Sequence, residues 1–391
     1  MVFENEPRLA VLMTGNVERD YRVSVKYQYY LKALTRHFHV AGVFDTSLRG
    51  IPRLMNALQV ARPNMQYWKQ RLYMNVPAFR LCSRRAANYV RTLREPVDVI
   101  LQDGVLFDAH WEALDIPSVI YTDYTARLSA RQPVAGRSPF TPREFEEWVW
   151  LETQAMQRAA HILTWSDFVR RSVIRDYNIP SERVTAVGGG VNFTRLPEVA
   201  PRPRRMPSTA LFIGADLHRK GGDLVLQAFE RLRRRVPAAR LVLITASPIP
   251  AGLSLEGVTL HSPIWDRDAI SDLYQQADLF VLPSRLETWG DVILEAMAYE
   301  LPCIGVAGQP MEEIIVHEKT GLLVPPEDIE ALAAAMLRLF ENPKLCRAWG
   351  RAGRTRLEDQ YTWKQVVNRM APVIRTASVK HNSLPYTICV D

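Results

Sequence analysis

Two successive series of short apolar segments, each alternating with helical patterns, constrain the fold of this 391-residue chain more than any other feature. In the first series the expected strands cover residues 9–14, 40–44, 97–101, 118–122, 162–165 and 185–191. In the second series they cover residues 210–213, 241–245, 257–260, 279–282, 303–306 and 322–324. Short apolar strands separated by helices predict parallel sheets covered on both faces. We therefore expect an α/β protein with two doubly wound, Rossmann-like domains.

Helical periodicity fills the gaps between these strands. Helices are expected over residues 21–35, 142–160, 167–177, 222–235, 268–276, 291–299, 311–317 and 328–340. Two more, over residues 345–360 and 362–374, follow without strand partners, and the tail from residue 378 is expected to be irregular.

A proline-rich segment separates the two series. Residues 196–207 hold four prolines and have the composition of a linker. We expect an N-terminal, acceptor-binding domain over residues 1–197, a C-terminal domain over residues 198–374, and a tail over residues 375–391 that returns to the N-terminal domain. Doubly wound domains bind ligands at the carboxyl ends of their strands, so the two domains should face each other across a cleft. Residues 197–207 and the crossing near residue 374 are the expected hinges for its closure.

Composition favours an ordinary globular protein of the cytoplasm. Hydrophobic residues make up 47% of the chain and charged residues 23%. The four cysteines are scattered without paired spacing, so we expect neither a disulfide framework nor a zinc site. The apolar run near the N-terminus is too short for a signal peptide, and none reaches the ~20 residues of a membrane span.

Positive charge is concentrated in the first half of the chain. Residues 1–195 hold 26 Lys and Arg against 19 Asp and Glu, a net charge of +7, whereas the rest hold 23 of each. Residues 49–94 contain ten basic residues and no acidic one, interleaved with apolar and aromatic residues. This pattern is typical of a surface that rests on anionic lipid headgroups or an acidic acceptor. It also fits a pair of solvated helices with ordinary cores.

The segment over residues 284–298 carries the most informative polar pattern. Glu287 lies in a loop after an apolar strand, Gly290 opens the next helix, and Glu295 lies five residues inside that helix. A helix N-terminus offers unpaired N–H groups and partial positive charge to a diphosphate. Each carboxylate accepts hydrogen bonds from two neighbouring hydroxyls, so one glutamate suits the ribose diol and the other a hexose. Taken alone, the two glutamates also fit a solvated loop residue and a charge on a helix face.

A second loop could bind phosphate in the same domain. Gly214 begins it after an apolar strand, and Arg219 and Lys220 precede two glycines that lead into a helix. Glycines at such a turn let the backbone and a cation approach a phosphate together. The same sequence also fits a plain turn with a solvated lysine.

Together with residues 162–171, 188–192, 278–284 and 320–326, these two loops make residues 160–375 resemble retaining glycosyltransferases of the GT-B fold. The resemblance is to family four, the group 1 glycosyl transferases. It implies that Lys220 binds the diphosphate, Glu287 contacts the donor sugar and Glu295 holds the ribose. It also implies that Gly290, Asp291 and Val292 present backbone N–H groups to the phosphates. The first 100 residues match this family only in pattern.

Three departures from the family pattern bear on the site. Ala215 stands where the family has arginine, so Arg219 is the candidate for the second cation. Asp123 stands near the position of a family histidine that faces the reacting sugar. The loop over residues 308–313 replaces a Gly-Gly-x-x-Glu loop, which changes the backbone available to the donor sugar.

The expected reaction is transfer of a hexosyl group from a nucleotide-diphosphate sugar to a hydroxyl acceptor. Fixed cations and helix N–H groups stabilise the leaving phosphate, so we expect neither a metal nor a cofactor. Lys220, Arg219 and the Gly290 helix end would hold the leaving group, while Glu287 and Asp123 position the sugar and the acceptor. The resemblance implies front-face attack with retention of anomeric configuration. The base, the sugar and the acceptor are not specified by the sequence.

Two other functions fit parts of the pattern. A sugar-nucleotide epimerase or phosphorylase on the same fold would need acid–base residues or a cofactor lysine that are not apparent. A basic protein that binds lipid or nucleic-acid surfaces would explain the charge of residues 49–94. We expect no nucleic-acid partner. Peripheral contact of residues 49–94 with an anionic inner membrane surface is one of two open interpretations, beside a pair of solvated helices.

One further motif resembles a metal signature. Asp266, Arg267 and Asp268 form an Asp-x-Asp sequence directly before an expected helix. Because aspartate is a favoured N-cap residue, we expect a helix cap here and no metal site.

Overall fold

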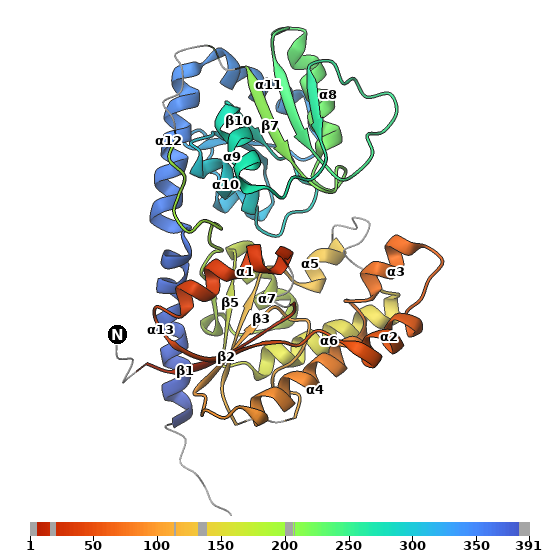
Figure 1. Cartoon of the computed structure of the whole chain (residues 1–391), viewed down its shortest axis with the longest axis vertical. Helices are drawn as coiled ribbons and strands as arrows, with labels where there is room; N and C mark the ends of the chain where they lie inside the picture. Colours follow the sequence, from red (N-terminus) through yellow and green to blue (C-terminus); the bar gives the residue numbers. More distant parts are fainter. Residues whose placement is uncertain are drawn as a thin grey trace, which may run out of the picture. The chain divides into compact units, whose positions relative to one another are not determined.

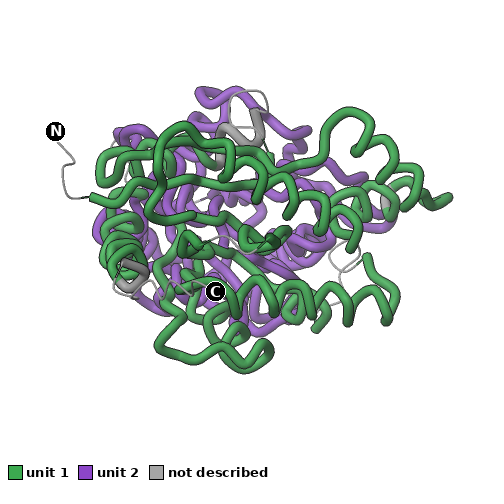
Figure 2. Tube along the Cα trace, turned by 90° about the horizontal axis from the view of Figure 1, so that it is seen from below, with its two compact units in different colours: residues 1–189, 363–391 green, residues 190–362 purple. Residues whose placement is uncertain are grey.

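The computed structural model describes residues 6–15, 21–112, 115–131, 139–199, 206 and 208–382. The chain divides into two compact units (Figure 2), and each contains a parallel sheet. The first unit comprises residues 1–189 and 363–391, and the second comprises residues 190–362.

The first unit is built on a six-stranded parallel sheet with the order β2-β1-β3-β4-β5-β6. Its strands are β1 (Arg8–Met13), β2 (His39–Asp45), β3 (Val99–Asp103), β4 (Ser118–Thr122), β5 (His161–Thr164) and β6 (Val184–Ala186). Its helices are α1 (Tyr21–Leu34), α2 (Gly50–Gln59), α3 (Met65–Arg71), α4 (Val76–Thr92), α5 (Ala126–Arg131), α6 (Pro142–Arg158), α7 (Asp167–Tyr177), the short η1 (Ser181–Arg183) and α13 (Trp363–Asn382). In this order β2 lies on one side of β1, and β3 and the later strands lie on the other side. Ligands of doubly wound folds bind at the carboxyl ends of the strands where the order reverses in this way, here β1 and β3.

The second unit repeats this plan with the order β12-β11-β10-β7-β8-β9. Its strands are β7 (Thr209–Ile213), β8 (Arg240–Ile244), β9 (Val258–His261), β10 (Leu279–Val281), β11 (Cys303–Val306) and β12 (Gly321–Val324). Its helices are α8 (Gly222–Arg233), α9 (Arg267–Gln276), α10 (Asp291–Ala298), η2 (Pro310–Glu313), α11 (Ile329–Glu341) and α12 (Pro343–Gln360) (Figure 1). Here the strand order reverses between β7 and β10, and the two loops singled out in the sequence follow these two strands. The expected fold class, two doubly wound parallel sheets, is confirmed.

The last helix departs from the sequence-based expectation. Helix α13 runs to Asn382, so the expected end at residue 374 and the irregular tail from residue 378 are wrong over the described residues. It packs against α1 and against strands β3, β4 and β5. These contacts group residues 363–382 with the first unit, so the division after residue 362 differs from the expected one after residue 374. The expected hinge near residue 374 lies inside this continuous helix.

The other boundary and one short helix also differ. The contacts divide the units at residues 189 and 190, where the composition suggested residues 197 and 198. Of the proline-rich linker, residues 200–205 and 207 lie outside the described residues. The helix expected over residues 311–317 is only the 3-10 turn η2, which begins at a proline.

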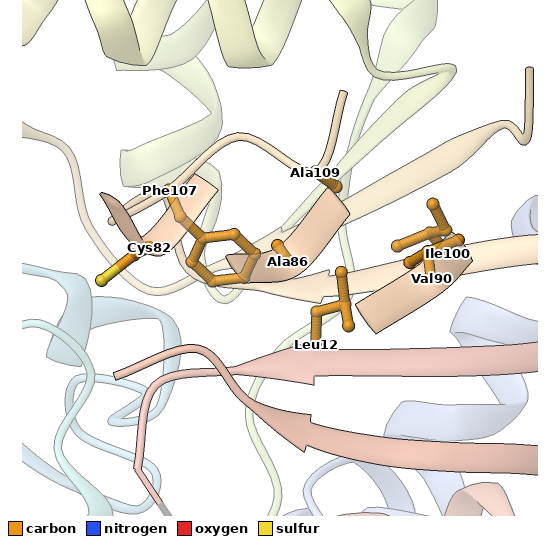
Figure 3. Packing of buried hydrophobic residues seen from close by; sticks show 7 residues of the cluster. All are labelled: Leu12, Cys82, Ala86, Val90, Ile100, Phe107 and Ala109. Carbon is orange, nitrogen blue, oxygen red and sulfur yellow. The ribbon is translucent and has the colours of Figure 1, made fainter. Parts of the chain in front are cut away.

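The middle of the basic segment contributes to the core of the first unit. Cys82, Ala86 and Val90 recur at every fourth position of α4 and pack against Leu12 of β1 and Ile100 of β3 (Figure 3). A helix that buries one face in this way belongs to the core. Residues 49–94 therefore do not form one continuous solvated surface.

Within the described ranges, no helix combines the length and the apolar character that crossing a membrane requires.

Candidate functional site

Glycines allow the loop after β7 to approach the end of β10. Gly221 has a φ of +73°, and a Cβ there would lie 2.1 Å from the carbonyl oxygen of Pro283. A Cβ on Gly214 would lie 2.7 Å from the Cβ of Lys220. Only glycine fits such contacts without displacing the backbone or its neighbour. These two glycines therefore set the backbone position from which the Lys220 side chain extends.

Lys220 and Glu287 meet in an ion pair at the end of β10. The Lys220 Nζ lies 2.5 Å from Glu287 Oε2, and the side chains are only 15% and 6% exposed. Ser284 Oγ donates to the same oxygen at 3.1 Å. Burial raises the pKa of the Glu287 carboxyl, but the charge and hydrogen bond of Lys220, together with Arg219 and Ser284, leave that pKa below its ordinary value. Glu287 is therefore an ionised acceptor at neutral pH.

Arg219 lies beside this pair. Its Nη1 donates to the carbonyl oxygen of Leu286 at 3.2 Å, and its backbone N–H donates to Asp216 Oδ1 at 3.0 Å. The guanidinium thus faces the loop that carries Glu287. The Arg219 Nε also lies 3.8 Å from Asp216 Oδ2, so each of the two cations at this loop has a carboxylate partner.

Helix α10 begins directly after this loop. Gly290 has a φ of +117° at the N-cap, and the N–H groups of Ile293 and Leu294 donate to its carbonyl oxygen. The N–H groups at the start of a helix, here those of Asp291 and Val292, carry the partial positive charge of the helix dipole. The structure brings this helix end, Glu287 and Lys220 to one edge of the second sheet.

Glu295 lies one turn further along α10. Its Oε2 accepts a hydrogen bond from Tyr274 at 3.0 Å, and its Oε1 lies 3.4 Å from Arg267 Nη1. The side chain is 13% exposed. Glu295 and Lys220 are therefore both largely buried within the second unit.

The sequence did not indicate Arg267 as a site residue, but it did indicate its neighbour Asp266 as a helix cap. Asp266 is the N-cap of α9, and its Oδ1 accepts hydrogen bonds from the N–H groups of Asp268 and Ala269 at 2.9 and 3.2 Å. The expected cap is confirmed. Among the described residues, no group of three or more His, Cys, Asp or Glu is placed to hold a metal ion.

Two contacts that the sequence did not indicate hold the Glu287 loop. Gln309 Oε1 accepts from the Glu287 N–H at 3.3 Å, and its amide donates to the Arg285 carbonyl at 3.3 Å. The Arg285 guanidinium makes a two-pronged pair with Asp223 at 2.7 and 2.9 Å. These partners are between 22 and 62 positions apart, so no local pattern could reveal them.

Asp123, the expected catalytic residue of the first unit, lines a cavity of about 310 Å³. The cavity lies at the carboxyl ends of β1, β3 and β4, where it is also lined by Asp103. Aromatic side chains complete much of the wall, namely those of Tyr27, Tyr73, Tyr121, Tyr124 and Trp165. Carboxylates can accept hydrogen bonds from hydroxyls, and aromatic faces can pack against apolar ring faces.

Glu152 is a wall residue that sequence analysis missed. This glutamate of α6 is 4% exposed and accepts hydrogen bonds from the Ala126 N–H, at 3.3 and 3.2 Å to its two oxygens. The Tyr177 hydroxyl donates to it as well. Burial is the main cause that raises the pKa of Glu152 to about 7, and these hydrogen bonds only partly oppose it. In the sequence Glu152 resembles any charge of an amphipathic helix.

Part of the second unit is similar to a known protein family. Residues 199–356 match the family model described as "Glycosyl transferases group 1". That range contains every predicted site residue of the second unit, from Gly214 to Glu295.

Curated relatives agree over a similar stretch. A glycogen synthase of Mycobacterium tuberculosis is 26% identical over 235 residues, which cover 58% of this chain and 56% of the relative. A D-inositol 3-phosphate glycosyltransferase of Thermobispora bispora is 28% identical over 258 residues, which cover 60% of each protein. The chain thus spans less than two thirds of the length of these relatives.

Solved structures extend the likeness to the whole fold. The sucrose-phosphate synthase of Thermosynechococcus elongatus superposes with a TM-score of 0.65 at 18% identity, over 96% of this chain and 100% of that one. At this identity the likeness establishes the architecture alone. The GT-B fold class implied by the sequence resemblance is confirmed.

Proposed function

We propose that this protein is a retaining, metal-independent glycosyltransferase that moves a hexosyl group from a nucleotide-diphosphate sugar to a hydroxyl acceptor. The buried Lys220–Glu287 pair beside the start of α10 carries this proposal. It joins a cation for phosphate, an ionised acceptor for hydroxyls and a helix N-terminus within one loop cluster. The match of residues 199–356 to group 1 glycosyl transferases supports the same chemistry.

The donor would be held by its diphosphate and its hydroxyls. Lys220 has three N–H donors, so it can keep its bond to Glu287 while another N–H binds a phosphate oxygen. Arg219 and the backbone N–H groups at Gly290, Asp291 and Val292 would share the remaining charge. Glu287 would accept from the hexose hydroxyls, and Glu295 from the ribose diol, in exchange for its bonds to Tyr274 and Arg267.

Transfer would proceed on one face of the sugar. The bond between the anomeric carbon and the phosphate oxygen breaks as the acceptor oxygen bonds to that carbon from the same side. The leaving phosphate oxygen takes the acceptor proton, so atoms and charge balance without a protein nucleophile. Fixed cations and N–H groups stabilise the developing phosphate charge without reorganising, which is why we propose that neither a metal nor a cofactor is needed.

The acceptor would bind in the cavity of the first unit. Asp123 and Asp103 supply carboxylates for its hydroxyl groups, and the tyrosines around them supply flat faces. This chemistry suits a hydroxyl-rich ring. We also propose a cytoplasmic location and peripheral contact with an anionic membrane through part of residues 49–94.

Calorimetry with UDP-, GDP-, ADP- and dTDP-sugars tests the donor site. One member of this panel should bind, and Lys220→Ala should weaken that binding by about 10- to 100-fold, because a hydrogen bond to a charged group is lost. Lys319→Ala, which removes an exposed lysine of the same unit, should leave the affinity unchanged. If no sugar nucleotide binds, or if Lys220→Ala binds as well as the parent, the proposal fails.

Metal independence and retention need separate measurements. Donor turnover should persist after treatment with a chelator, and loss that magnesium restores would disprove metal independence. Proton NMR of the sugar released when water is the acceptor should first detect the donor's own anomer. The inverted anomer as first product would disprove retention.

A further inference from the structure

Gln309 connects two loops of the second unit. It follows β11 at the N-cap of η2 and is only 5% exposed, although it is polar. Of residues 308–313, all of which the structure describes, it is the one buried polar residue. A buried polar side chain normally has hydrogen-bond partners, and both partners of Gln309 lie in the loop that carries Glu287.

The Gln309 amide bridges the backbone of that loop. Its oxygen accepts from the Glu287 N–H and its nitrogen donates to the Arg285 carbonyl, both at 3.3 Å. Because an N–H only donates and a carbonyl only accepts, these partners fix which end of the amide faces which backbone group. Only a side chain that carries both an acceptor and a donor can make both bonds. The amide therefore holds residues 285–287 in one conformation.

The loop after β7 holds the same three residues through other backbone groups. The Arg285 N–H donates to the Arg219 carbonyl at 2.9 Å, and the Leu286 carbonyl accepts from Arg219 Nη1 at 3.2 Å. Arg219 and Gln309 thus pair complementary groups of residues 285–287. If the Gln309 bonds are removed, those of Arg219 remain, so we expect this loop to shift rather than to unfold.

Gln309 itself is anchored to β11. Met311, two residues further on, is fully buried, and its Sδ accepts from the Val306 N–H at 3.1 Å. The Gly308 N–H donates to Glu312 Oε1 at 2.7 Å. These contacts fix the chain on both sides of Gln309, so its amide is a rigid support for the neighbouring loop.

The Glu287 carboxylate depends on this support because both of its oxygens are already engaged. Oε2 accepts from Lys220 and Ser284, and Oε1 accepts from the Thr288 N–H at 3.2 Å. A carboxylate has about four acceptor positions, so positions remain for hydroxyl groups of a ligand. Their directions are set by these bonds and by the backbone of Glu287. A displaced backbone would therefore point the remaining positions away from such hydroxyls.

We propose that Gln309 is a positioning residue that orients Glu287 toward the hydroxyls of the transferred hexose. The inference rests on the proposed function, because it takes Glu287 as the group that accepts from the hexose. The groups proposed to bind the diphosphate have supports of their own. Lys220 begins in a loop that Gly221 sets against the Pro283 carbonyl, and the N–H groups of α10 belong to the helix end. Gln309 should therefore affect the binding of the hexose and not that of the diphosphate.

Calorimetry with two ligands tests the inference. The first is the sugar nucleotide that binds from the panel of UDP-, GDP-, ADP- and dTDP-sugars, and the second is its nucleoside diphosphate, which lacks the hexose. Gln309→Met keeps an unbranched side chain but removes both hydrogen bonds. It should weaken binding of the sugar nucleotide by about five- to tenfold, as the loss of one hydrogen bond to the hexose would. Its affinity for the diphosphate should be that of the parent, which also shows that the variant is folded.

Gln276→Met, at an exposed glutamine of α9 in the same unit, is the matched control and should leave both affinities unchanged. An equal or larger loss of diphosphate affinity in Gln309→Met would show that Gln309 only stabilises the loops, and would overturn the inference. Unchanged affinity for both ligands would overturn it as well. In either case sugar-nucleotide binding by the parent leaves the proposed function standing. If the parent binds no sugar nucleotide, the proposed function fails and the inference fails with it.

Discussion

Two buried glutamates whose pKa values shift in opposite directions show what decides charge at the residue scale. Burial raises the pKa of both Glu287 and Glu152. At Glu287 the adjacent Lys220 and Arg219 more than offset this effect, whereas the partners of Glu152 are the Tyr177 hydroxyl and a backbone N–H. The cations beside Glu287 therefore keep that glutamate ionised at neutral pH, whereas Glu152, with no cation in contact among the described residues, titrates at about pH 7.

Glu152 predicts a pH dependence of stability. Its folded pKa of about 7 exceeds the ordinary value of 4.5, so the native state binds this proton more tightly than the unfolded chain. The resulting stability is full below about pH 4.5 and is lost as the pH rises to about 7. Glu152→Gln cannot ionise, so its unfolding free energy should gain about 3 kcal/mol relative to the parent between pH 4 and pH 8.

Urea unfolding of both proteins across this range measures the difference. The Glu152→Gln substitution also adds a constant offset, because the new amide nitrogen cannot accept from the Ala126 N–H, so only the change with pH is informative. Parallel pH profiles for the two proteins would show that the Glu152 carboxyl does not titrate there.

At the scale of elements, the loops are shaped by contacts that local sequence only partly encodes. Gly221 ends the Lys220 loop in a left-handed conformation against the Pro283 carbonyl. Asp266 ends another loop by capping α9. A cap is visible in the sequence because its partners are two and three residues away, while the approach of Gly221 to Pro283 spans 62 positions.

Gly221→Ala and Gly252→Ala separate conformational strain from steric clash. Both glycines have positive φ, at +73° and +87°, but nothing lies within 4 Å of a Cβ at Gly252. Gly252→Ala should therefore cost about 1 kcal/mol for the backbone conformation alone. Gly221→Ala should cost about 1–3 kcal/mol more, because its Cβ overlaps a carbonyl oxygen. Equal losses in chemical denaturation would contradict the close approach.

The Asp266→Ala substitution distinguishes two roles of Asp266, a helix cap and a metal ligand. Loss of the two N–H contacts should lower the unfolding free energy by about 1 kcal/mol. Thermal unfolding should give the same loss with and without magnesium. A magnesium-dependent stabilisation of the parent that Asp266→Ala removes would instead favour a metal site.

At the scale of the whole molecule, each unit has its own core. The first unit combines residues 1–189 with residues from 363 onward, which follow the second unit in the sequence. Trp363, the first residue of α13, is 5% exposed and its ring lies 5.0 Å from that of Tyr30. It also contacts the Trp165 ring edge-on at 6.1 Å. A helix that follows the second unit in sequence thus forms part of the first unit.

Trp363→Ala should therefore weaken the first unit selectively. Removing a buried tryptophan leaves a cavity and costs about 3–5 kcal/mol. Under the proposed function a sugar nucleotide binds the second unit and stabilises its unfolding transition. Trp363→Ala should leave the temperature of that transition unchanged. Calorimetric scans with and without the nucleotide distinguish the two transitions, and a uniform loss in both would argue that the units unfold together.

The sequence by itself determined the two parallel sheets, most helix positions and the two loops of the proposed donor site. These features have local causes: apolar periodicity, glycine, and cap residues act within a few positions of themselves. The end of α13 beyond residue 374 was missed because residues 375–382 contain only two apolar residues, Ala377 and Val379, and so show no helical apolar period.

Tertiary structure alone decided which side chains meet. It paired Lys220 with Glu287, bound Gln309 and Asp223 to the loop that carries Arg285 and Glu287, and buried Glu152 in a cavity wall. It also assigned part of the basic segment to the core and left α2 with its apolar face outward. Contacts between residues distant in the chain depend on the packing of whole elements, and an ionisable group takes its charge state from the partners that this packing provides.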